Sequence, residues 1–206
     1  ISSTGTVPIT NNEVTQDDLD AVLESASAIT IPGDQKILHR IPQEYIIDKQ
    51  DGIRVPIGMS GIRLESRVHI VTGANNAIEN IVKCIKKCGR SVQELVLEQI
   101  ASNESVLTSD EKELGVCLID IGGGTSDIAV FSNASLEFTS SIAIGGDQVT
   151  NDISVALKTS RSNADEIKKF YGCTKPELVN SEEMIEVPGV GERPSKKLSK
   201  HRLAEF

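Results

Sequence analysis

A run of glycines after an acidic residue is the clearest candidate for chemistry in this chain. Gly122, Gly123 and Gly124 follow Asp120 and precede Thr125. Consecutive glycines allow backbone N–H groups to approach an anion closely, as in backbone nests that bind phosphate. Asp120 is placed to hold magnesium through water, and Thr125 to bind a phosphate oxygen, because magnesium takes few carboxylates and keeps several waters. A tight hairpin with a capping aspartate is the structural alternative.

Two other phosphate-binding loops can be tested against the same residues. A Walker A loop requires Gly-Lys-Ser/Thr, and a dinucleotide-binding loop requires glycine at position 127 with a helix after it. The chain has Asp127 there, and an apolar strand-like run, 128–131, follows. Both loops are therefore excluded.

A second glycine pair lies at an expected strand-to-helix junction. Gly145 and Gly146 precede Asp147, and an apolar helical pattern follows. A helix N-terminus preceded by glycines can bind an anion. Asp147 is equally well explained as a helix cap.

The elements before these loops form two groups. Residues 1–73 predict a small helix-plus-sheet module, with a helix near 15–28 that begins at a Thr15/Asp18 capping box. The pattern predicts further elements in order along the chain: strands over 36–48 and 62–72 with a loop at 51–61 between them; a helix capped by Asn76 with Glu79 and ending at Gly89; a short buried strand at 95–97; a helix over 99–107; and a polar break at 108–112.

The glycine turn is expected within an α/β arrangement. Apolar runs over 116–121 and 128–131 predict a hairpin around it. After these come an expected strand over 136–144, a helix after Asp147, a helix capped by Ser162 with Asp165 and ending at Gly172, a short strand before the loop 188–194, and a helix beginning at Ser199.

Composition narrows the class of protein. The net charge of -9 disfavours nucleic acid as a partner. No stretch reaches the roughly 18 apolar residues of a membrane span, and the N-terminus has no signal-peptide pattern, so a cytoplasmic location is expected. The four cysteines predict reduced, buried thiols.

The glycine loops resemble those of a large superfamily. The chain has a strand that leads into Asp120-x-Gly-Gly-Gly-Thr, then two strands, and then Gly-Gly-Asp147-x-x-Thr150 before a helix. This order is similar to that around the second phosphate loop of the actin, sugar-kinase and Hsp70 proteins. Within that superfamily the chain resembles the FtsA family of bacterial cell-division proteins nearly from end to end. The matching stretches are Val7–Ile9, Ile41–Asp48, Gly58–Gly61, Val68–His69 and Leu107–Glu111.

This resemblance implies a fold and a set of sites. The fold is a partial actin-like (ribonuclease H-like) α/β ATPase core with a small α+β subdomain called 1C. The implied partition is 1–73 as 1C, 74–112 as part of 1A, 113–158 as part of 2A, and 159–206 as the start of 2B. Asp120 would help to hold magnesium and the Gly/Thr turn would contact the ATP phosphates, with Gly145, Gly146 and Asp147 close by. Glu98 falls where relatives often place the residue that orients the attacking water; a solvent-facing role at a strand end is the alternative.

The implied function is that of an ATP-binding protein that polymerises and attaches the FtsZ ring to the cytoplasmic face of the inner membrane at the division site. It would recruit later division proteins, reach the membrane through a C-terminal helix absent from this chain, and turn ATP over slowly at most. The alternatives are the related adaptor of type IV pilus assembly and a kinase or Hsp70-type ATPase. Both chain ends are expected to be cut, so these 206 residues alone are expected to be inactive.

Overall fold

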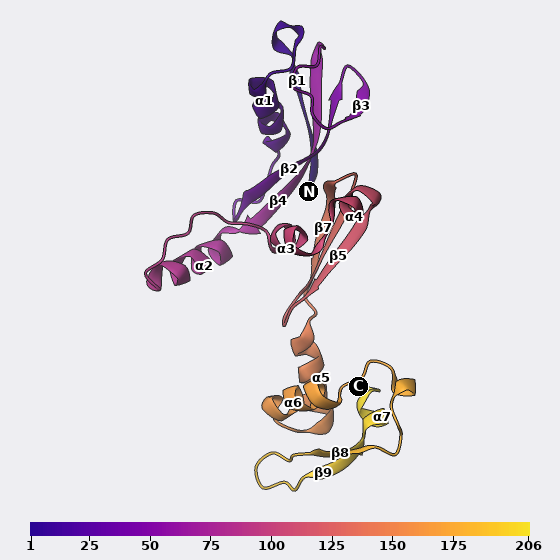
Figure 1. The fold of residues 1–206 in the computed structure, drawn as a ribbon. Helices are drawn as coiled ribbons and strands as arrows, with labels where there is room; N and C mark the ends of the chain where they lie inside the picture. The colour runs from indigo at the N-terminus through magenta and orange to yellow at the C-terminus, as the bar shows by residue number, and fades with distance from the viewer. The chain divides into compact units, whose positions relative to one another are not determined.

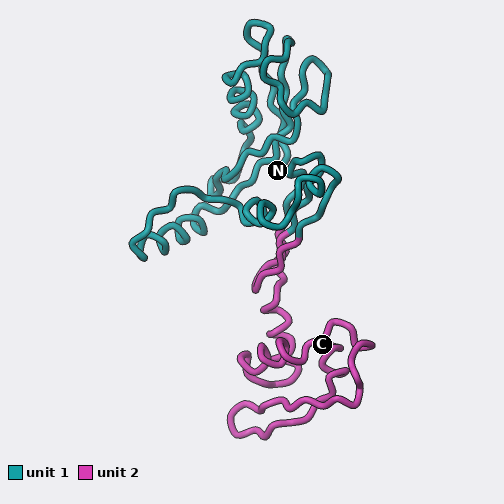
Figure 2. The backbone as a smooth tube through the Cα atoms, viewed as in Figure 1, with its two compact units in different colours: residues 1–118, 128–140 teal, residues 119–127, 141–206 magenta.

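The computed structural model describes residues 1–206, a mixture of helices and strands. The chain divides into two compact units, coloured separately in Figure 2. One unit comprises residues 1–118 and 128–140, and the other comprises residues 119–127 and 141–206.

The first unit begins with a four-stranded sheet (Figure 1). The strands lie in the order β1 (Ser2–Pro8), β4 (Arg63–Ala74), β2 (Gln35–Ile47) and β3 (Gln50–Ile53), with antiparallel neighbours. The expected strands over 36–48 and 62–72 are confirmed. The expected loop at 51–61 is partly wrong, because Asp48 and Lys49 take positive φ angles and turn the chain back into β3.

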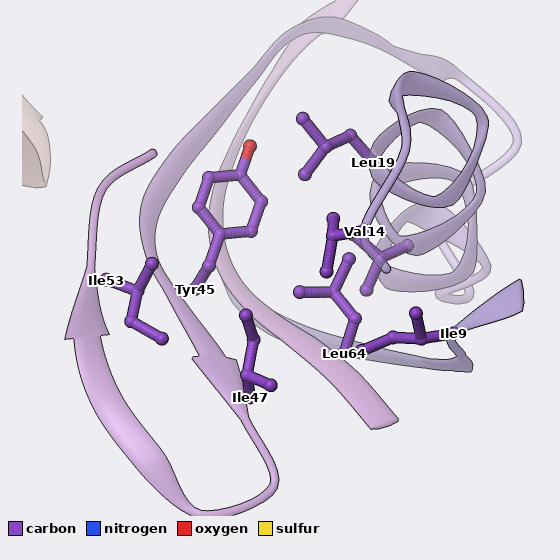
Figure 3. Packing of buried hydrophobic residues seen from close by; sticks show 8 residues of the cluster. Ile9, Val14, Leu19, Tyr45, Ile47, Ile53 and Leu64 are labelled. Atoms are coloured by element: carbon purple, nitrogen blue, oxygen red, sulfur yellow. The ribbon is translucent and has the colours of Figure 1, made fainter. Parts of the chain in front are cut away.

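Helix α1 (Gln16–Ser27) covers this sheet and is capped as predicted. The Thr15 hydroxyl accepts from the Asp18 N–H while the Asp18 carboxylate accepts from the Thr15 N–H, at 3.4 and 2.9 Å. A compact apolar cluster lies between the helix, the sheet and the segment before the helix, as Figure 3 shows. Its buried members are Ile9, Val14, Leu19, Val22, Tyr45, Ile47, Ile53 and Leu64.

Three helices follow the sheet and correct several sequence expectations. Helix α2 (Asn75–Lys87) has Ala74 as its N-cap with no side-chain bond, so the cap predicted at Asn76 is wrong. Residues 95–97 form no strand; the Leu97 N–H instead donates to the His39 ring at 2.9 Å. Helix α3 (Glu98–Val106) is confirmed, but the expected polar break is a short helix, α4 (Ser109–Leu114), with its own capping box at Thr108.

The chain then forms a three-stranded sheet, β5 (Val116–Ile121), β6 (Ser126–Ser132) and β7 (Ser135–Ile142), in that order. The hairpin around the glycines and the third strand were both predicted. Within the first unit, Ala129, Phe131 and Leu136 form a buried cluster with Ile41 and Ile100 packed against it.

The second unit holds the glycine turn and the C-terminal elements. These are α5 (Gly146–Leu157), α6 (Arg161–Tyr171), β8 (Met184–Val187), β9 (Lys196–Ser199) and α7 (Lys200–Leu203). Ser199 caps α7 as predicted, whereas Ser160, not Ser162, caps α6. Helices α5, α6 and α7 pack with the β8–β9 hairpin through a core of Ile153, Leu157, Ala164, Ile167, Ile185, Val187 and Leu203.

Two composition-based expectations can also be compared with the structure. All four cysteines are free, but Cys84, Cys88 and Cys117 are exposed and Cys173 is half-buried, so the expectation of buried thiols is wrong. None of the helices combines the length and the apolar character needed to cross a bilayer.

Candidate functional site

The glycine turn joins β5 to β6 and leaves two of its backbone N–H groups without a hydrogen-bond partner. The Gly122 N–H donates to the Thr125 carbonyl oxygen at 2.9 Å and closes the turn. The N–H groups of Gly123 and Gly124 donate no hydrogen bond within this unit. A Cβ atom on Gly124 would meet nothing within 4 Å. The turn therefore presents open backbone donors, as a phosphate nest requires.

The second glycine pair lies against this turn. The N–H groups of Gly146 and Asp147 donate to the carbonyl oxygens of Gly122 and Gly123, at 2.9 and 2.7 Å. A Cβ atom on Gly145 would lie 2.5 Å from the Gly123 oxygen, so this close approach requires glycine. Gly145 is the N-cap of α5 and Asp147 lies inside its first turn, so the capping role considered for Asp147 is wrong. The pair holds the turn in place, and its phosphate-binding role stays a prediction.

Two polar side chains of the turn region already have partners. The Thr125 hydroxyl is exposed and donates to the Asp127 carboxylate at 3.0 Å. The Ser126 hydroxyl donates to the Ile144 carbonyl oxygen at 2.7 Å and ties the start of β6 to the end of the segment after β7. Thr125 can exchange its carboxylate partner for a phosphate oxygen because both are anionic acceptors.

Two basic side chains from α6 lie beside the turn, and sequence reasoning missed both. The Lys168 ammonium donates to the Gly146 oxygen at 2.9 Å and to the Thr150 hydroxyl at 2.7 Å. The Arg161 guanidinium pairs with the Asp147 carboxylate at 3.0 Å. No local pattern reveals these contacts, because they join two helices that pack together.

The candidate metal residue is accessible. Asp120 is half-buried near the end of β5, on the same face as Leu118, and its neighbours Ile119 and Ile121 are exposed. A half-buried carboxylate two residues before the glycine turn is compatible with a magnesium ion bound through water. Magnesium binding at Asp120 stays a prediction.

Glu98 lies in the other unit from the glycine turn. It is the exposed first residue of α3, not the end of a strand. A carboxylate in the first turn stabilises a helix through the helix dipole, which gives Glu98 a structural role of its own. Its role in orienting water stays a prediction.

Comparison with known proteins identifies the family. A family model described as "SHS2 domain inserted in FTSA" matches residues 1–72, and one described as "Cell division protein FtsA" matches residues 117–204. The curated cell division protein FtsA of Pseudomonas aeruginosa is 53% identical over 205 residues, which is 100% of this chain and 49% of that protein. The chain belongs to the FtsA family.

Other FtsA proteins give the same result. The chain is 52% identical to FtsA of Neisseria meningitidis, over 99% of this chain and 49% of that protein. It is 46% identical to FtsA of Escherichia coli K12, over 98% of this chain and 48% of that protein. The chain spans about half the length of these relatives.

Solved structures support the predicted fold class. The structure of a PilM-PilN type IV pilus biogenesis complex matches with a TM-score of 0.57 and 15% identity, over 83% of this chain and 47% of that chain. At this identity the likeness shows the fold alone. The fold is part of an actin-like α/β core, as predicted, and the sequence identity favours the FtsA family over the pilus alternative.

Proposed function

We propose that the full-length protein is an actin-like, ATP-binding cell-division protein. The observation that carries this proposal is the identity of about half of all residues to curated FtsA proteins along the whole chain. The protein polymerises, attaches the FtsZ ring to the cytoplasmic face of the inner membrane and recruits later division proteins. It reaches the membrane through an amphipathic C-terminal helix outside these residues.

The proposed partition follows the actin-like plan. Residues 1–73 form the 1C subdomain, 74–112 part of 1A, 113–158 part of 2A, and 159–206 the start of 2B. Two observations support the first boundary: one family model ends at residue 72, and the last strand of the four-stranded sheet ends at Ala74.

The phosphates of ATP bind at the glycine turn. The free N–H groups of Gly123 and Gly124 donate to phosphate oxygens, and Thr125 turns from Asp127 toward the ligand. Asp120 holds magnesium through water, which supplies charge neutralisation at the phosphates. Glu98 orients water for a slow, regulatory hydrolysis that needs the complete cleft, so the 206-residue chain alone hydrolyses no ATP.

The test is calorimetric titration of Mg-ATP into the full-length protein and two variants. Asp120→Ala removes the proposed magnesium carboxylate, and Gly124→Ala places a methyl group in the open space over the turn. Both variants should lose at least about tenfold in affinity, because Gly124→Ala blocks a direct contact of a charged ligand and Asp120→Ala removes the carboxylate that holds magnesium through water. Gly33→Ala is the matched control, since a Cβ atom there also meets nothing within 4 Å.

Equal binding by Asp120→Ala and the unmodified protein would make the glycine turn an ordinary hairpin. Absence of binding by the unmodified protein would refute the ATP-dependent part of the proposal. Hydrolysis by the isolated 206-residue chain that Asp120→Ala abolishes would refute its predicted inactivity.

A further inference from the structure

An acidic side chain lies beside the donors assigned to phosphate. The carboxyl atoms of Asp147 are 3.8 to 3.9 Å from the position that a Cβ atom on Gly123 would take. The Asp147 N–H also donates to the Gly123 oxygen, so the residue is tied to the turn by its own backbone. The Asp147 carboxylate therefore lies beside Gly123, whose N–H is one of the donors proposed to bind phosphate.

An uncompensated carboxylate at this place would oppose a phosphate. Two unit charges about 4 Å apart in water interact strongly enough to change an equilibrium constant about fivefold. A positive charge near Asp147 therefore favours nucleotide binding.

Two basic side chains lie near the start of α5, and they have different partners. The Lys168 ammonium contacts the Gly146 oxygen, the Thr150 hydroxyl and, at 3.3 Å, the Asp165 carboxylate, so its three N–H donors are occupied. The Arg161 guanidinium is the group that pairs with Asp147, at 3.0 Å.

Helix electrostatics does not explain this pair of cations. Both lie near the first turn of α5, which is the positive end of its dipole and favours anions over cations. A cation placed there is useful when it compensates a carboxylate or a bound anion.

We propose that Arg161 neutralises Asp147 and thereby limits how strongly nucleotide binding depends on magnesium. This inference rests on the proposed function, because it concerns the same glycine turn. When Arg161 is absent, the Asp147 carboxylate remains beside the phosphates and a divalent cation must screen it. Arg161 acts through Asp147 and is a positioning residue, not a ligand of the nucleotide.

The experiment measures the equilibrium affinity of the full-length protein for ATP by calorimetry, in EDTA and in saturating magnesium. The variants are Arg161→Ala, Asp147→Asn and the double variant. Arg202→Ala is the matched control, because Arg202 is exposed to the same degree as Arg161, 62% against 63%, and also pairs with a carboxylate, that of Glu205, in the same unit.

We expect Arg161→Ala to bind ATP about fivefold more weakly in EDTA and with a smaller loss in magnesium. Adding Asp147→Asn should restore the affinity in EDTA, and Arg202→Ala should change nothing. Unchanged affinity of Arg161→Ala in EDTA would overturn the proposal, and so would a double variant as weak as Arg161→Ala, which would make Arg161 a direct ligand. If the unmodified protein binds ATP in neither buffer, the proposed function itself fails.

Discussion

Two regions of the molecule are each stabilised by a different kind of interaction: the four-stranded sheet with α1, and the region of the glycine turn. In the sheet region, apolar side chains from β2, β3, β4 and α1 converge on one cluster, in which Leu64 has no exposed surface. Around the turn, the contacts are backbone hydrogen bonds from α5 to the carbonyl oxygens of Gly122 and Gly123, and side-chain bonds from α6.

The sheet region is therefore expected to contribute mainly stability, and the turn region mainly the proposed function. A region stabilised by burial tolerates loss of any one polar contact, whereas the turn depends on a few bonds and on the absence of a side chain at one position. The side chains next to the turn, Ile119, Ile121 and Ile144, are exposed and add little packing to it. Substitutions should therefore affect the two regions in different ways.

The largest effect is expected from emptying the sheet's core. Leu64→Ala should reduce the free energy of unfolding of the sheet by about 3 kcal/mol, because it removes a fully buried side chain and leaves a cavity. Hydrogen exchange of the β4 amides in the full-length protein measures this. Ile62→Ala is the control, since Ile62 is 73% exposed and should cost less than about 0.5 kcal/mol. Equal effects of the two variants would refute the assigned core.

A smaller effect, confined to the other region, is expected at the glycine pair. Gly145→Ala should destabilise the turn by about 2 kcal/mol, because the new Cβ atom would lie 2.5 Å from the Gly123 oxygen and force the backbones apart. Amides of residues 122–125 and 146–150 should exchange faster, while those of β4 stay unchanged. Unchanged amide exchange at the turn would mean that the close contact between Gly145 and the glycine turn does not exist in solution.

The features that sequence predicted best are those fixed by local patterns. The Thr15/Asp18 capping box, the strands on either side of the glycine turn and the helix after Gly145 all follow from spacing within a few residues. Helix α4 also has such a local signal, because Thr108 and Glu111 form a capping box. The helix was not predicted because its sequence is short and polar.

The features that sequence missed depend on distant neighbours. Asn76 with Glu79 resembles a cap, but β4 continues to Ala74 because it pairs with the start of β2, and the helix begins at once. The apolar residues 95–97 have no strand to pair with, and His39 satisfies the Leu97 N–H instead. The contact of Lys168 with Gly146 spans 22 residues and requires α5 and α6 to pack together first.

The smallest effect on stability is expected from removing a polar contact in the sheet region, which is stabilised mainly by buried apolar side chains. Thr15→Ala should cost about 1 kcal/mol, because it removes the cap of α1. The Thr15 hydroxyl, followed by the Thr15 N–H, holds the pKa of Asp18 below its usual value by donating to the carboxylate.

That pKa shift gives the substitution a pH dependence. Because the folded-state pKa is lowered, the stabilisation is present above the unfolded pKa of about 3.9 and is lost as the pH falls through the folded value. Thr15→Ala should therefore unfold with a shallower acid slope, measured by circular dichroism between neutral and acidic pH. Asp51→Asn, at an exposed position in β3 away from any helix terminus, should leave that slope nearly unchanged. A parallel downward displacement of the curve for Thr15→Ala, with the same slope, would show that the hydroxyl caps the helix without setting the ionisation of Asp18.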